Sequence, residues 1–167
     1  MRKRIVDCVL ATDMTLHNKE YSYIKLKLDT FNIADGENTD KIFENLDNMG
    51  IFSTQQEFLN TLIHTADISN PTKPLSVYEK WVGLVMEEFW LQGDKEKEMK
   101  LPVSFLCDRT TVKVPASQLG FMEGIVYPLV LIVVSLMPGV KFMIENINSN
   151  KAHYRKLKEE DDEKNKK

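Results

Sequence analysis

Two side chains that can bind a metal ion, His64 and Asp67, lie three positions apart in the segment HTADISNP. On a helix this spacing places both on one face, next to an apolar stripe. A carboxylate there is costly to bury unless it is paired or bound to a cation. The alternative interpretation is a network at a helix end, with Asp67 on a neighbouring donor and His64 hydrogen-bonded in the core. A single pair is a weak signal, so spacing alone favours this structural interpretation.

A second pattern, Gln118 and Phe121 in SQLGF, places an amide and an aromatic ring on one face of a predicted helix. The amide can donate and accept hydrogen bonds, and the ring can stack on a flat heterocycle. Such a pair can grip a nucleobase, although this spacing is common in helices and core packing is the default interpretation. Val85 and Phe89, four positions apart, are core residues by themselves. They would contribute to a binding site only if they formed the wall opposite Phe121.

The composition is that of one soluble globular domain, with 43% hydrophobic and 28% charged residues in a chain of 167. The net charge of -3 argues against a nucleic-acid polymer as partner, because such a partner requires a basic surface. A small anionic ligand is compatible with this charge, since a bound metal ion supplies positive charge locally. The two cysteines, Cys8 and Cys107, have no ligand-like spacing. We therefore expect buried free thiols and a reducing, intracellular (cytoplasmic) compartment.

Helical periodicity dominates the sequence, and no run alternates for long enough to indicate a strand. We therefore predict an all-α fold, a multi-helix bundle without internal repeats. The predicted helices cover roughly residues 4–28, 54–69, 75–99, 115–137 and 140–157. A polar loop over 32–53 separates the first two and contains a short helical turn near 42–46. The charged stretch 158–167 has no apolar residue and is expected to be disordered.

Two apolar stretches imitate targeting or membrane signals. The basic start is followed by an apolar run from Ile5 to Leu10, but Asp7 interrupts that run, which favours an amphipathic helix over a signal peptide. This helix begins without a capping residue, as expected of a chain that starts in mid-domain. The apolar run 125–140 contains prolines and is shorter than the ~20 residues of a spanning helix, so we expect a core helix and no membrane span.

Five segments, in the same order and at similar spacing, resemble the class I cyclic-nucleotide phosphodiesterases. They are VLATDMTLH, HTADISNPTKP, FWLQGDKEKEM, LCDRTT and SQLGFMEGIVYP. The resemblance runs from about Arg2 to about Pro138 and is weakest across 32–53. It implies that residues 1–157 are the C-terminal part of the family's all-α catalytic domain. Five segments in register are much more specific than any one of them.

The resemblance also implies roles for particular residues. The family holds two divalent metal ions, zinc and magnesium or manganese, whose bridging hydroxide attacks the cyclic phosphate. By this likeness Asp67 is a zinc ligand, His64 stands behind it in a supporting position, and Thr12 lies near the metal ions. The residues implied to bind the nucleotide are Gln118 as the amide that recognises the purine, Phe121 and Val85 as a clamp on the base, and Phe89, Asn70, Leu106 and Met14 around them.

The chain departs from the family at the metal centre. The family takes its other zinc ligands, two histidines and an aspartate, from segments that precede the region matched here, and the histidine that acts as general acid also comes from there. The histidines of this chain are His17, His64 and His153, and none lies in an HNxxH or HDxxH pattern. A catalytic zinc needs about three protein ligands. We therefore expect no catalytic residue within this chain, a missing N-terminal part of the domain, and little or no activity of the 167 residues alone.

The predicted function is hydrolysis of 3′,5′-cyclic nucleotides, cAMP or cGMP or both, to 5′-monophosphates. In this prediction the chain supplies the base pocket and one zinc ligand. An alternative is a non-catalytic domain of the same fold that binds nucleotide or a partner protein. A third interpretation, a structural bundle with accidental motifs, is disfavoured by five segments in register. A glutamine amide can present either edge to a base, so the sequence leaves the choice between adenine and guanine open.

Overall fold

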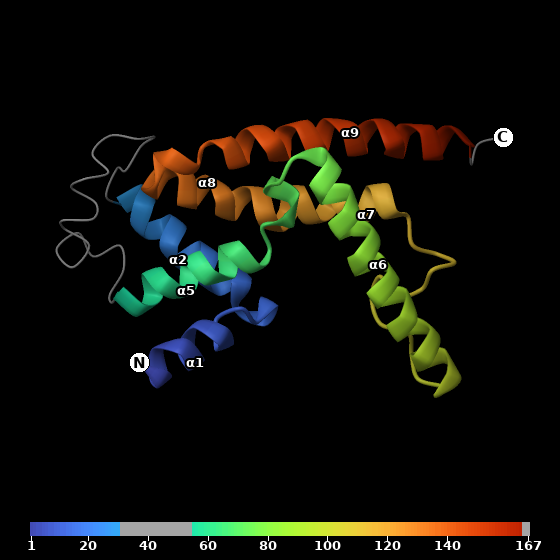
Figure 1. The fold of residues 1–167 in the computed structure, drawn as a ribbon, viewed down its shortest axis with the longest axis horizontal. Coiled ribbons are helices and arrows are strands. Elements are labelled where there is room, and N and C mark those ends of the chain that lie inside the picture. The colour runs from blue at the N-terminus through green and yellow to red at the C-terminus, as the bar shows by residue number, and fades with distance from the viewer. Residues whose placement is uncertain (31–54, 165–167) are drawn as a thin grey trace. The chain divides into compact units, whose positions relative to one another are not determined.

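The computed structural model describes residues 1–30 and 55–164, and this part of the chain is helical without strands (Figure 1). The all-α class is therefore confirmed. The predicted loop over 32–53 and its short turn lie outside the described residues. The elements in order are α1 (Arg2–Leu10), the 3₁₀ turn η1 (Met14–Leu16), α2 (His17–Thr30), α5 (Gln55–Asp67), η2 (Asn70–Thr72), α6 (Leu75–Glu98), α7 (Val114–Phe121), the π-helical turn η3 (Met122–Val126), α8 (Tyr127–Leu136), η4 (Pro138–Val140) and α9 (Phe142–Lys164).

The chain divides into two compact units. Unit 1 comprises Met1–Ser69 and Val126–Ile144, and unit 2 comprises Asn70–Ile125 and Glu145–Lys167. Unit 1 thus contains α1, α2, α5 and α8, and unit 2 contains α6, α7 and most of α9.

The prediction of one helix over 4–28 is wrong, because the chain leaves the helix between α1 and α2. The Asp13 carboxylate accepts a hydrogen bond from the backbone N–H of Thr15 at 2.9 Å. The Thr12 hydroxyl donates to the carbonyl of Val9 at 2.8 Å. Short polar side chains that bond to the nearby backbone compete with helical hydrogen bonds and favour helix ends.

The core of unit 1 lies between α2 and α8. Ile24 and Leu28 pack with Ile132 and Leu136, and Phe58 of α5 lies against this cluster. Helical turns continue from Val114 to Leu136, and by length and composition this run could cross a membrane. Core helices pass the same test, and the buried residues of α8 belong to a core: Leu129, Val130, Ile132, Val133 and Leu136. Pro128 is accommodated near the start of α8, directly after the π-helical turn.

A pair of buried histidines joins α2 to α5 in unit 1. His17 Nδ1 lies 2.9 Å from His64 Nε2, and the two side chains are almost fully buried. Only one proton fits between the two nitrogen atoms, so one ring donates and the other accepts. Burial of the imidazole, with a smaller contribution from His64, lowers the pKa of His17 below its ordinary value.

In unit 2 the amides of α9 hold the turn that precedes α6. Asn150 Nδ2 donates to the carbonyls of Pro71 at 2.9 Å and Lys73 at 2.8 Å, and Asn146 Nδ2 donates to the carbonyl of Thr72 at 2.9 Å. Asn150 is buried, so these bonds replace the water that its amide loses on folding.

The C-terminal helix is longer than predicted. It was expected to end near Leu157, and residues 158–167 were expected to be disordered, but α9 continues to Lys164. Ion pairs at i,i+4 spacing, Lys156–Glu160 and Lys158–Asp162, lie on its last turns. Such pairs stabilise a solvated helix that has no apolar anchor.

The histidine pair predicts acid sensitivity of unit 1. Because the pKa of His17 is lowered in the folded state, the unfolded chain binds a proton first as the pH falls below about 6.5. The free energy of unfolding should therefore decrease from that pH downward, until the pH passes the lowered value. Urea unfolding followed by circular dichroism between pH 7.5 and 5 measures this slope.

Replacing His17 by asparagine should flatten the slope, whereas Thr61→Ser should not, because it changes another buried polar side chain of unit 1 without adding or removing a titratable group. Equal slopes in the wild type and the His17→Asn variant would contradict a role for this pair in acid sensitivity.

Candidate functional site

Unit 2 contains a cavity of about 140 Å³ between α6, α7 and two connecting segments. The residues predicted to bind the nucleotide all line this cavity, with the exception of Met14. The complete lining consists of Asn70, Trp81, Val82, Val85, Met86, Phe89, Leu106, Ser117, Gln118 and Phe121.

The two helices place these side chains through their regular spacing. Val85 and Phe89 are four positions apart on α6, and Gln118 and Phe121 are three positions apart on α7. Residues at these spacings share one face of a helix. The three apolar side chains are half-buried, as expected of walls around an open cavity, and Gln118 is buried at 9% exposure.

The amide of Gln118 is oriented by a tyrosine. The Tyr78 hydroxyl donates a hydrogen bond to Gln118 Oε1 at 2.7 Å, and Gln118 Nε2 lies 3.9 Å from the sulfur of Met86. Tyr78 is fully buried. Burial, reinforced by Tyr154, raises the pKa of Tyr78 well above its usual range, so the hydroxyl keeps its proton and remains a donor.

The contact between Tyr78 and Gln118 was not predicted from the sequence. The available signal was spacing: Tyr78 precedes Val85 by seven positions, two helical turns, and so shares its face. Trp81 also lines the cavity, although it is 49% exposed.

The residues predicted for the metal centre lie in unit 1. Asp67 ends α5 and is exposed, while His64 is buried and bonded to His17. No hydrogen bond between the side chains of His64 and Asp67 is present within this described region. Thr12 bonds to the backbone of its own turn, and Met14 is 43% exposed in η1.

The described residues do not fit a complete zinc or magnesium site. No group of three or more His, Cys, Asp or Glu side chains that could hold a metal ion occurs in residues 1–30 and 55–164. The imidazole nearest Asp67 in sequence, His64, uses its Nε2 atom to bond His17. One exposed carboxylate falls short of the about three protein ligands that a catalytic zinc requires.

Comparison with known proteins gives consistent matches. The model of the 3′5′-cyclic nucleotide phosphodiesterase family matches residues 1–147. A 3′,5′-cyclic-AMP phosphodiesterase, isoform F, of Drosophila melanogaster is 37% identical over 158 residues, covering 94% of this chain and 23% of the relative. A probable 3′,5′-cyclic-AMP phosphodiesterase of Caenorhabditis elegans is 36% identical over 163 residues, covering 96% of this chain and 23% of the relative.

Solved structures show the same fold. LmjPDEB1 in complex with IBMX matches with a TM-score of 0.75 and 28% identity, over 94% of this chain and 43% of that one. The phosphodiesterase domain of the RhoPDE fusion protein from the choanoflagellate Salpingoeca rosetta matches with a TM-score of 0.77 and 24% identity, over 97% and 48%.

The chain spans less than a quarter of the length of these curated relatives and less than half of these solved chains. Within that span the family match covers most of its residues, including every residue that lines the cavity of unit 2. The chain therefore belongs to the 3′5′-cyclic nucleotide phosphodiesterase family.

Proposed function

We propose that the cavity of unit 2 binds the purine base of a 3′,5′-cyclic nucleotide, which the complete protein hydrolyses to the 5′-monophosphate. The observation that carries the proposal is the Tyr78–Gln118 hydrogen bond, which presents a fixed amide to a cavity whose other lining residues are mostly apolar. Small-molecule sites combine an apolar lining with a few oriented polar groups in this way. The relatives named above are cyclic-AMP phosphodiesterases, which supports cAMP as the substrate.

In this proposal the base lies between Val85 of α6 and the phenyl ring of Phe121 on α7. Both side chains line the cavity and are half-buried, so they can exchange contact with water for contact with a flat ring. Stacking of a base on an aromatic side chain is worth ~1–3 kcal/mol.

The orientation of the Gln118 amide gives the cavity a basis for choosing between purines. Adenine and guanine differ at position 6, where adenine carries an amino donor and guanine a carbonyl acceptor. Gln118 can match either base only by exchanging the positions of its oxygen and its amino group. Because Oε1 accepts from Tyr78, such an exchange would turn the amino group toward the hydroxyl, which would then have to accept a hydrogen bond instead of donating one.

The family's metal ions are not assigned a site within this chain. We propose that Asp67 contributes one carboxylate to a metal centre whose other ligands, and the general acid, lie in sequence outside these 167 residues. Its exposed position at the end of α5 leaves the carboxylate free to face such a partner segment. Both cysteines are free thiols, Cys107 buried as expected and Cys8 only half-buried, and free thiols support an intracellular protein.

Replacing Phe121 by alanine should weaken nucleotide binding more than chemistry. Loss of the stacking surface predicts a rise in KM for cAMP of roughly one to two orders of magnitude. The measurement is steady-state kinetics in a restored catalytic domain, meaning this chain joined to the N-terminal part of a family member's catalytic domain. Phe105→Ala is the matched control, because Phe105 is 89% exposed and does not line the cavity. Equal KM values in the two variants would rule out the stacking role.

Tyr78→Phe should weaken the discrimination between adenine and guanine, while the phenyl ring keeps the space of the tyrosine ring filled. Removal of the hydroxyl frees the Gln118 amide, and a neutral hydrogen bond contributes ~0.5–1.5 kcal/mol, so the ratio of kcat/KM values for cAMP and cGMP should change roughly two- to tenfold. Gln118→Ala should change the same ratio and also raise KM. Tyr154→Phe is the control, since it removes a buried hydroxyl that does not bond Gln118. An unchanged ratio in both cavity variants would disprove the proposed recognition.

Asp67→Ala should lower the zinc content and the hydrolysis rate of the restored domain without a large loss of stability. The side chain is exposed, so its removal leaves no cavity in the core. Asp29→Ala, at another exposed carboxylate of unit 1, should change neither property. Metal content and melting temperature are measured on the same samples. A folded Asp67→Ala protein with full zinc content and activity would contradict the assignment of Asp67 as a metal ligand. An unmodified restored domain that binds nucleotide without hydrolysing it would favour the alternative of a non-catalytic binding domain.

A further inference from the structure

Leu106 reaches the cavity from the segment that connects α6 to α7, not from a helix. Its backbone has a φ of 63°, in the left-handed region that a branched side chain disfavours. A residue stays in such a conformation only when its surroundings hold it there. The contacts on both sides of Leu106 therefore determine whether this wall of the cavity is in place.

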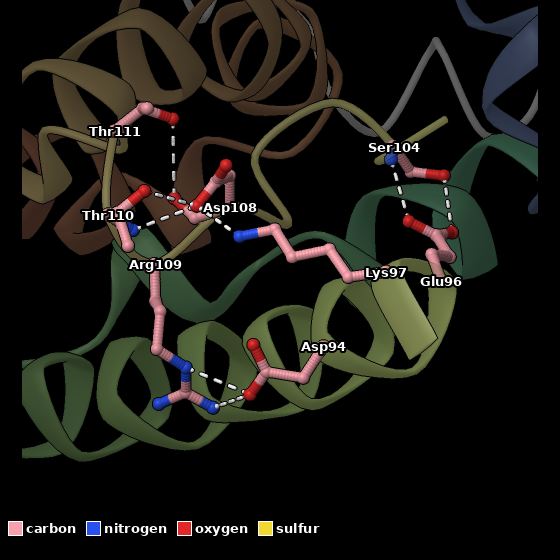
Figure 2. A network of polar contacts seen from close by, with 8 residues as sticks. All are labelled: Asp94, Glu96, Lys97, Ser104, Asp108, Arg109, Thr110 and Thr111. Atoms are coloured by element: carbon pink, nitrogen blue, oxygen red, sulfur yellow. Dashed lines mark hydrogen bonds and ion pairs between the residues drawn. The ribbon is translucent and has the colours of Figure 1, made fainter. Parts of the chain in front are cut away.

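Three sets of polar contacts connect this segment to the C-terminal half of α6 (Figure 2). Before Leu106, the backbone N–H and the hydroxyl of Ser104 donate to the two carboxylate oxygens of Glu96, at 2.7 and 2.6 Å. After it, Lys97 Nζ donates to Asp108 Oδ1 at 2.8 Å. The guanidinium of the next residue, Arg109, donates to Asp94 Oδ2 through Nε at 3.0 Å and Nη2 at 2.6 Å.

The segment also lies in direct backbone contact with α6. Gly93 is buried in the helix, and a β-carbon built on it would meet the backbone carbonyl of Cys107. Glycine is therefore required at this position for the segment to approach so closely. Cys107, the neighbour of Leu106, is 3% exposed as a result.

We propose that these contacts form a clasp that holds Leu106 against the nucleotide, with Asp108 and Arg109 as positioning residues that set its affinity. The clasp is defined as the pairs Glu96–Ser104, Lys97–Asp108 and Asp94–Arg109. This inference rests on the proposed function of the cavity, but the existence of the clasp does not. The clasp residues do not line the cavity, so they act on the base only through Leu106.

Several features make the clasp a stable arrangement instead of a set of independent surface pairs. Asp108 also accepts hydrogen bonds from the backbone N–H and the hydroxyl of Thr110, at 3.0 and 2.7 Å. These two bonds orient the carboxylate independently of Lys97. The hydrogen bond from Lys97, together with the two from Thr110, holds the pKa of Asp108 well below its usual range, so the carboxylate stays charged at neutral pH. The guanidinium of Arg109 lies 5.6 Å from the centre of the Trp90 ring, which limits the positions it can adopt.

The test has two arms on the restored catalytic domain, and the first needs no nucleotide. The labelling rate of Cys107 by N-ethylmaleimide, measured by peptide mass spectrometry, reports how often the segment leaves α6. Loss of one partly exposed ion pair in Asp108→Asn should increase this rate roughly two- to fivefold. Cys8, which lies in unit 1, serves as the internal reference and should keep its rate.

The second arm measures kcat and KM for cAMP in Asp108→Asn, Lys97→Gln and the double variant. KM should rise by a factor similar to the increase in labelling, with a smaller effect on kcat. The double variant should fall short of the product of the single effects, because each single change already breaks the same pair. Asp108→Glu should restore part of both readouts. Lys158→Gln is the matched control, since it breaks a Lys–Asp pair on α9 and should change neither.

The outcomes separate three hypotheses: that the clasp exists, that Leu106 sets nucleotide affinity, and that the cavity binds a cyclic nucleotide. Unchanged labelling of Cys107 in all variants would overturn the clasp itself. Faster labelling with an unchanged KM would overturn the role of Leu106 in affinity. If the wild-type domain neither binds nor hydrolyses cAMP while labelling still responds, the proposed function fails, and the positioning role fails with it.

Discussion

The hydrogen bond between Tyr78 and Gln118 is the interaction on which the cavity depends. Gln118 is buried, and an amide oxygen left without a donor there would cost ~1–3 kcal/mol. The bond therefore links α6 to α7 beside the cavity that both helices line. Tyr78 is in turn held by the ring of Tyr154 from α9, 5.4 Å away between centroids, and α9 bonds the turn before α6 through Asn150. The Gln118 amide, on α7, is thus supported by contacts that involve three helices of one unit.

The residues proposed for base recognition and the residue proposed for the metal centre belong to different units. The residues proposed to hold the base all belong to unit 2 and form one cavity, whereas the proposed metal ligand, Asp67, is an isolated exposed carboxylate of unit 1. This division is consistent with a chain that spans less than half of the solved family members it matches. The physical consequence is that the nucleotide-binding proposal can be tested on residues of unit 2 alone, without reference to the proposed metal ligand.

The helices could be predicted from the sequence because they follow from short-range spacing, whereas most cavity residues were predicted through the resemblance to a family, since spacing alone favoured core packing for them. The long apolar stripe of α6 and the SQLGF segment of α7 define their faces without reference to the rest of the chain. The features that could not be predicted depend on distant partners or on side-chain caps. His17 and His64 are 47 positions apart, so their bond leaves no local pattern. The helix break at Asp13 and the left-handed conformation of Leu106 arise from specific side-chain contacts that periodicity does not encode.

The most direct measurement of the central claim is photolabelling with 8-azido-cAMP, followed by mass spectrometry of the modified peptides. An azide on the base reacts with whatever lines its site, so it locates the purine independently of catalysis. The account predicts adducts within 75–98, 101–113 or 114–126, the segments around the cavity, and their loss when unlabelled cAMP is added. Adducts confined to unit 1, or adducts that unlabelled cAMP does not reduce, would contradict it.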